Sequence, residues 1–295
     1  MPILQTSTGR LSYLVEGSGP PVLLVQGAGI VGEGWRPQFD ELRDRFTVIT
    51  LDNRGIGAST LPAEPLTIER MAADALAITE ALDIPRFHLA GHSMGGLIAQ
   101  EVALRARDRV ASLAFFCTFA HGRQAARLTP AMLLTALRMR IGPRPMRRRA
   151  FTELVMPASY LQQVDRAELA ERLRALFGYD LAEQPSIAIK QVRAMSRYDA
   201  GERLASLGGI PTLVVSATED RIARPGFGRE LAALIPGARY VEISDAGHAV
   251  TIQCAGRINQ LLVDHLSEAE AAAGDVSSAH ADNAPGRSRA RRITS

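Results

Sequence analysis

Short apolar runs alternate along this chain with segments of helical periodicity, and this alternation limits the folds open to it. The apolar runs are rich in β-branched residues, which is typical of strands that are buried on both faces of a sheet. Strands that alternate with helices form a mostly parallel sheet with helices on both faces, so the predicted fold class is α/β. We expect strands at 21–27, 46–52, 86–91, 110–118, 210–218 and 238–244, and helices at 67–82, 96–106 and 226–235.

The alternation stops between residues 121 and 200, where the sequence predicts helices and contains no clear strand. Thr129 precedes a proline, a pairing that is typical of a helix N-cap followed by the first helical position. Asp165 resembles the start of a capping box for a helix near 166–177. The expected organisation is one core formed by residues 1–120 and 201–266, with residues 121–200 inserted as a helical lid.

The last 29 residues have a different composition from the rest of the chain. Residues 267–295 contain few large apolar side chains, so we expect a disordered tail there. The whole chain of 295 residues is 46% hydrophobic, which suffices for one large core with an insertion. Its net charge is only +3, which argues against a nucleic-acid-binding protein.

Two cysteines, Cys117 and Cys254, lie in apolar surroundings. Two cysteines form neither a disulfide framework nor a metal cluster, so we expect no metal site. The N-terminal residues show no basic stretch followed by a long apolar run, and no window holds 18 uncharged apolar residues. We therefore expect a cytoplasmic protein with no transmembrane segment.

Ser93 stands between Gly91 and Gly95 in the stretch GHSMGG (91–96). Glycine and serine are common, so this pattern also occurs by chance and its surroundings must decide. A serine nucleophile on a sharp turn needs a strand before it and a helix after it, and the predicted elements supply both. The glycines allow strand and helix to approach closely, and the helix N-terminus favours negative charge near the serine. Ser93 is therefore the candidate nucleophile.

A serine nucleophile needs a base, and the base needs an acid that orients it. His248 follows the expected strand 238–244 in the loop DAGH, whereas the other histidines lie in a strand, the turn of Ser93, the lid, a terminal helix and the tail. Asp220 follows the strand 210–218, with Glu219 beside it as the alternative acid. The order Ser93, Asp220, His248 is the one expected for a serine hydrolase of this architecture.

With these residues in place, the core resembles the α/β-hydrolase superfamily. GHSMGG resembles its nucleophile elbow, LDNRGIGAST (51–60) resembles its D-x-R-G-x-G-x-S loop, and the segments around Asp220 and His248 are similar to those carrying its acid and base. The resemblance implies an oxyanion hole formed by the backbone N–H groups of Ala28 and Met94. The family usually has His-Gly before this loop, whereas this chain has Gln26 and Gly27.

Four residues near the glycine-rich turn are expected to lie near the substrate. Trp35, the only tryptophan, lies just beyond the glycine-rich turn, and packing in the core is an equally good interpretation of it. The glycine-rich turn itself is also compatible with a simple flexible loop. The candidate pocket residues are Gly27, Gly29, Trp35 and His92.

These residues predict hydrolysis of a small-molecule carboxylic ester or lactone through an acyl-enzyme, with no metal and no organic cofactor. The same triad is compatible with acyl transfer, if an alcohol replaces water, and with hydrolysis of a carbon–carbon bond beside a ketone. A third alternative is a ligand-binding sensor with vestigial hydrolysis. Epoxide hydrolases and dehalogenases of this fold use a carboxylate nucleophile, so Ser93 argues against both.

The predicted lid is strongly basic. Between residues 121 and 200, 14 basic and seven acidic side chains give a net charge of +7, and residues 138–149 hold six arginines and no acid. This surface is either a solvated helical face or a docking surface for an anionic carrier, substrate or membrane. Five methionines of the lid suit either an adaptable apolar pocket or ordinary packing.

Overall fold

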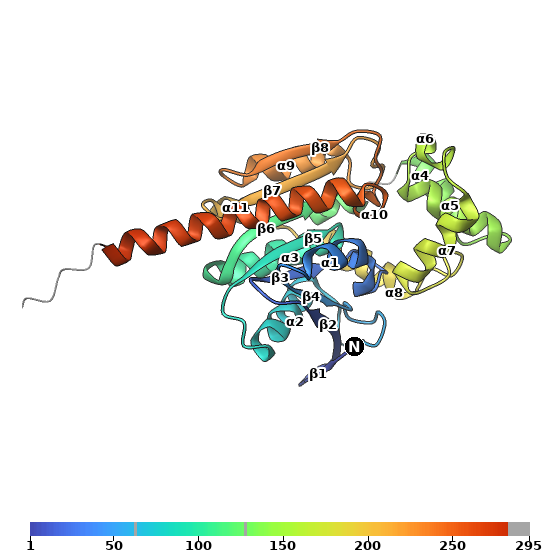
Figure 1. The fold of residues 1–295 in the computed structure, drawn as a ribbon. Coiled ribbons are helices and arrows are strands. Elements are labelled where there is room, and N and C mark those ends of the chain that lie inside the picture. The colour runs from blue at the N-terminus through green and yellow to red at the C-terminus, as the bar shows by residue number, and fades with distance from the viewer. Residues whose placement is uncertain (62–63, 127–128, 283–295) are drawn as a thin grey trace, which may run out of the picture.

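The computed structural model describes residues 1–61, 64–126 and 129–282. Within these residues, eight strands form one sheet in the order β1-β2-β4-β3-β5-β6-β7-β8. The first two strands are antiparallel to their neighbours, and the six strands from β3 to β8 are parallel. Helices cover both faces of the sheet, so the predicted α/β-hydrolase architecture is confirmed (Figure 1).

All six predicted strands are present, with ends that differ from the prediction by at most two residues. The parallel strands are β3 (Pro21–Val25), β4 (Thr47–Leu51), β5 (Phe87–His92), β6 (Val110–Phe116), β7 (Thr212–Ala217) and β8 (Arg239–Ile243). The hairpin formed by β1 (Ile3–Thr6) and β2 (Gly9–Glu16) was not predicted. These two strands lie at the edge of the sheet and are only partly buried, so neither is a continuous apolar run.

The core helices pack in pairs against the sheet. α1 (Arg36–Leu42) packs against α11 (Ala255–Asp282), and α2 (Ile68–Ala81) packs against α3 (Met94–Arg105). α9 (Pro225–Leu234) packs against β7 and β8, and the short α10 (Val250–Gln253) precedes α11. The predicted N-cap of α2 is present, since the Thr67 side chain accepts a hydrogen bond from the Arg70 N–H.

Residues 121–200 hold a group of helices set at one end of the sheet (Figure 1). Their caps agree with the sequence: the Thr129 side chain caps the first, and the Asp165 side chain accepts from two backbone N–H groups at the start of the fourth. His121 and Asp199 form a β-bridge, so the two ends of the segment meet. The helices are α4 (Pro130–Arg138), α5 (Arg144–Val155), α6 (Ala158–Leu161), α7 (Arg166–Phe177) and α8 (Ile187–Arg197).

The prediction of a disordered tail from residue 267 is wrong for the described part of it. α11 continues as a helix to Asp282, with Leu266 and Ala269 buried and Glu270 Oε1 at 3.1 Å from His88 Nε2. The alanines here favour a helix and need little space, whereas the prediction relied on large apolar side chains alone. Residues 283–295 lie outside the described residues.

Candidate active site

Ser93 occupies a sharp turn between β5 and α3. Its backbone has φ 54° and ψ −118°, a region that side chains other than glycine rarely adopt. A Cβ on Gly91 would collide with the backbone of Gly95, and a Cβ on Gly95 would collide with the carbonyl of Val25. The two glycines of the motif are therefore required for strand and helix to approach as closely as they do.

The end of β6 holds this turn in place. The Ser93 N–H donates to the Phe116 carbonyl at 3.0 Å, and the Thr118 hydroxyl donates to the Ser93 carbonyl at 2.6 Å. The Thr118 side chain is buried and also lies against Gly96. Sequence reasoning missed Thr118, because a threonine after a strand is common and only the fold places it beside the serine.

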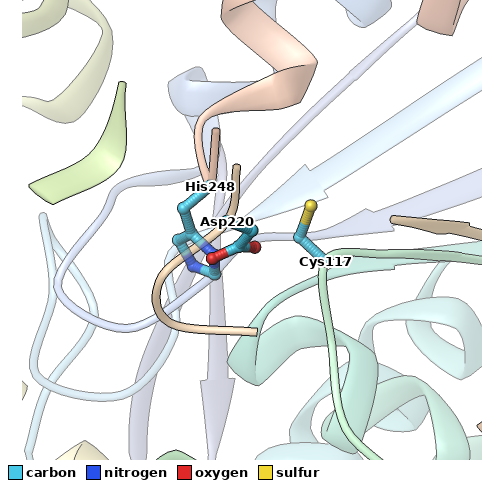
Figure 2. A group of neighbouring side chains, drawn as sticks. All are labelled: Cys117, Asp220 and His248. Carbon is cyan, nitrogen blue, oxygen red and sulfur yellow. The ribbon is translucent and has the colours of Figure 1, made fainter. Parts of the chain in front are cut away.

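The structure brings Ser93, His248 and Asp220 together in one hydrogen-bonded chain. His248 Nε2 lies 3.0 Å from Ser93 Oγ, and His248 Nδ1 lies 2.7 Å from Asp220 Oδ2. His248 follows β8 and Asp220 follows β7, so the three residues come from the carboxyl ends of three parallel strands. In Figure 2 the carboxylate of Asp220 faces the ring of His248.

The carboxylate of Asp220 is fully buried and fully hydrogen-bonded. Its Oδ1 accepts the N–H groups of Ile222 at 2.7 Å and Ala223 at 2.9 Å, while Oδ2 faces His248. Burial alone would raise the pKa of Asp220, but the charge of His248 and these hydrogen bonds hold that pKa below its usual value. Glu219 is exposed and accepts from Ser159 at 3.5 Å, so the contact with His248 belongs to Asp220.

The loop after β3 lies directly beside the serine. A Cβ on Gly27 would lie 3.2 Å from Ser93 Cβ, and the Gly27 N–H donates to the side chain of Gln26 at 2.8 Å. Among the described residues, no acceptor is present for the N–H groups of Ala28 and Met94. Both N–H groups are therefore free to donate to another oxygen at this site.

Gln26 replaces the usual histidine and holds the loop through its side-chain oxygen. Besides the Gly27 N–H, this oxygen lies 3.0 Å from His92 Nδ1, and His92 Nε2 lies 2.8 Å from the His248 carbonyl. Burial and the nearby His248 lower the pKa of His92 to about 3, so its ring is neutral at neutral pH. A neutral imidazole carries one N–H group, so His92 donates to only one of these two oxygens and lies in contact with the other.

Trp35 is a core residue. It is 0% exposed, and its ring packs edge-on against Phe116 at 5.8 Å and His92 at 6.4 Å between centroids. The structure therefore supports the packing interpretation of Trp35 and not the pocket interpretation.

Among the described residues, two of the hollows between the lid and the core border Asp220 or His248, and their lining could not be predicted from the sequence. A cleft of about 510 Å³ runs between α4 and the loop that carries Asp220, and it includes Met132, Thr135, Arg221 and Arg224. A small apolar cavity of about 30 Å³ lies beside His92 and His248. Its apolar lining residues are Ile30, Phe151, Val155, Phe177, Ala249 and Ile252.

Cys117 lies beside Asp220 in Figure 2. The ligand atoms of Cys117, Asp220 and His248 all lie within 4.8 Å of one another, which is close enough to bind a metal ion. Burial, together with the charge of Asp220, raises the pKa of the Cys117 thiol, whereas metals bind the thiolate. The aspartate and histidine are also hydrogen-bonded to each other, so the cluster fits a metal ion poorly.

Comparison with known proteins identifies the family of the chain. The family model described as alpha/beta hydrolase fold matches residues 20–253. The RutD protein of Variovorax paradoxus, to which carbamate hydrolysis is ascribed, is 31% identical over 88% of this chain and 97% of its own length. The enol-lactonase of Burkholderia xenovorans LB400 is 30% identical, covers 90% of this chain and 100% of its own, and superposes with a TM-score of 0.75. A thermophilic esterase of Thermogutta terrifontis is 27% identical over 90% of this chain and 98% of its own, with a TM-score of 0.74.

Proposed function

The chain belongs to the α/β-hydrolase family, and from that premise we propose that it hydrolyses a carboxylic ester or lactone with Ser93 as the nucleophile. The observation that carries the proposal is the continuous chain from Ser93 Oγ through His248 to Asp220, with distances of 3.0 and 2.7 Å. A histidine so placed can take the proton of the serine and return it to a leaving group.

The reaction proceeds in two steps at one centre. Ser93 Oγ attacks the carbonyl carbon while its proton passes to His248 Nε2, and the tetrahedral oxyanion accepts hydrogen bonds from the Ala28 and Met94 N–H groups. Each such donor is typically worth about 3 kcal/mol in the transition state. The His248 proton then passes to the leaving alkoxide, and the same histidine activates the water that cleaves the acyl-enzyme.

Asp220 acts on the histidine and not on the substrate. Its Oδ2 accepts a hydrogen bond from the N–H group at His248 Nδ1, which keeps the lone pair of Nε2 directed at Ser93. Since its pKa is held below the usual value, Asp220 remains charged and stabilises the imidazolium that forms. These steps need no metal and no organic cofactor.

The relatives support the class of substrate. An enol-lactonase and an esterase both cleave a carbonyl–oxygen bond, and a carbamate also presents a carbonyl flanked by a heteroatom. We therefore infer that an ester or lactone carbonyl is the reacting group, and an aryl carbamate belongs in the same substrate panel. A small molecule suits the buried position of Ser93 and His248 beneath the lid.

The test is a panel of p-nitrophenyl esters of increasing chain length, with the Ser93→Ala variant and a serine-directed phosphonate. We expect Ser93→Ala to lower kcat by as much as a million-fold while the fold is retained, and the phosphonate to label wild type alone. More than a few per cent of residual turnover in the pure variant would contradict the nucleophile. Stoichiometric labelling without turnover would instead indicate a ligand-binding protein, and ester formation with an added alcohol would indicate acyl transfer.

A further inference from the structure

The helix α4 of the lid turns an apolar face to solvent. None of the described residues of this helix is buried, and its outer side is formed by three leucines with an isoleucine just beyond its end. The spacing puts all four on one face of the helical turn. Their side chains are Leu133, Leu134, Leu137 and Ile141, which are 53%, 49%, 52% and 62% exposed.

The opposite side of α4 is already occupied. Met132 and Thr135 face the cleft that also borders Asp220. The side of α4 that faces the core lines this cleft. The exposed leucines therefore belong to the opposite side, and a displaced lid does not explain their exposure. We call Leu133, Leu134, Leu137 and Ile141 the outer face of α4.

The arginines of the lid divide into two groups that the sequence does not distinguish. Arg144, Arg148 and Arg149 form ion pairs with acids of the lid, namely Asp180, Glu183 and Glu153. Arg138 and Arg140 are exposed, and no acidic partner is present for them among the described residues. These two cations lie in the sequence between Leu137 and Ile141 of the outer face of α4, so free positive charge and exposed apolar surface lie together.

We propose that the outer face of α4 docks the lid on an anionic phospholipid surface. Exposed leucines beside arginines are the composition of helices that lie in the plane of a membrane interface, with apolar side chains among the acyl chains and cations at the headgroups. In this proposal α4 lies on the membrane surface. None of the described helices is long and apolar enough to span a bilayer.

Charge argues against two other occupants of this face. In a two-fold dimer through α4, Arg138 and Arg140 of both copies would be brought close together and would repel. Residues 283–295 of the same chain carry four arginines and no acid, so they do not complement the face either. An anionic lipid surface supplies both an apolar layer and the opposite charge.

Docking through α4 would place the cleft beside Asp220 next to the lipid surface, because the same helix forms one wall of that cleft. Apolar acyl substrates partition into such a surface, so they would enter the site from it. The docking itself does not depend on the proposed hydrolysis, and the two can fail separately.

The test is sedimentation of the full chain with vesicles of phosphatidylcholine and phosphatidylserine at 3:1, compared with phosphatidylcholine alone, at about 0.1 M salt. We expect binding to the anionic vesicles. The Arg138→Gln/Arg140→Gln variant should weaken it by about fivefold for each arginine, and the Leu134→Ser/Leu137→Ser variant should abolish it. Both are surface changes that leave turnover of a short soluble ester unchanged.

A matched control variant removes two positive charges from the surface of the α/β core instead of the lid. Arg10 and Arg239 are exposed on β2 and β8, and the Arg10→Gln/Arg239→Gln variant should bind vesicles as wild type does. Equal binding to both vesicle types, an equal loss in the control, or no sedimentation at all would overturn the proposal. A dimer by analytical ultracentrifugation that the leucine variant dissociates, without vesicle binding, would assign the face to a second copy instead.

Discussion

Replacing Asp220 with asparagine changes the charge and hydrogen-bonding of one buried side chain while keeping its size. The carbonyl oxygen of the asparagine can still accept the N–H groups of Ile222 and Ala223, which now lie 2.7 and 2.9 Å from Oδ1. This arrangement turns the amide NH2 toward His248 Nδ1, at the place where Oδ2 lies at 2.7 Å. The amide N–H group therefore donates a hydrogen bond at the position where the carboxylate oxygen accepted one.

The consequence is the wrong tautomer of His248. Its Nδ1 must then accept, so its proton moves to Nε2, 3.0 Å from Ser93 Oγ, and the serine loses its base. In the serine-protease template this exchange lowers kcat by about 10⁴, equivalent to about 5.5 kcal/mol of transition-state stabilisation. We expect a loss of that order for Asp220→Asn.

The assay is kcat for a soluble p-nitrophenyl ester at neutral pH, with melting temperature measured in parallel to show that the variant is folded. The matched control is Glu219→Gln, which alters the neighbouring carboxylate without touching His248. We expect the control to retain turnover close to that of wild type. A loss of less than tenfold in Asp220→Asn, or a larger loss in Glu219→Gln, would refute the assignment of the acid.

Three further outcomes follow from particular contacts. Thr118→Val removes the hydroxyl that donates to the Ser93 carbonyl and should lower kcat about tenfold with KM nearly unchanged, whereas Thr118→Ser should retain activity. Burial lowers the pKa of His88 to about 4 from the usual 6.5, so the folded state opposes its protonation. The melting temperature should therefore fall as the pH is lowered from 6.5 to 4, and it should fall less steeply in the His88→Gln variant. Truncation after Asp282 should leave the melting temperature unchanged, whereas truncation after Leu266 should lower it by several degrees, because it removes the buried Ala269 and the contact of Glu270 with His88.

The sequence predicted the parts of the fold whose burial is uniform. Strands β3 to β7 are almost wholly buried and stand out as apolar runs, whereas β8 at the sheet edge is only partly buried. Ser93, Asp220 and His248 follow β5, β7 and β8. Because the carboxyl ends of parallel strands meet at one edge, this pattern was enough to predict that the three residues meet. The β1–β2 hairpin has mixed burial and was missed for that reason.

The contacts made across the fold could not be predicted in the same way. The role of Thr118 depends on β6 lying beside β5, and the division of the lid arginines depends on where Asp180 and Glu153 lie. The net charge of a segment therefore says little about its free charge, because acids distant in sequence can neutralise it. The role of Trp35 was ambiguous for a similar reason. A large aromatic ring beside a turn can pack in the core or line a pocket, and only the fold distinguishes the two.

The lid contributes to the site and does not merely cover it. Gln191 of α8 is fully buried, and its side-chain oxygen accepts the N–H of Gly29 at 2.7 Å. Gly29 has φ 77° and directly follows Ala28, one of the two proposed oxyanion donors. A displacement of α8 has to break this bond and release the loop that positions Ala28.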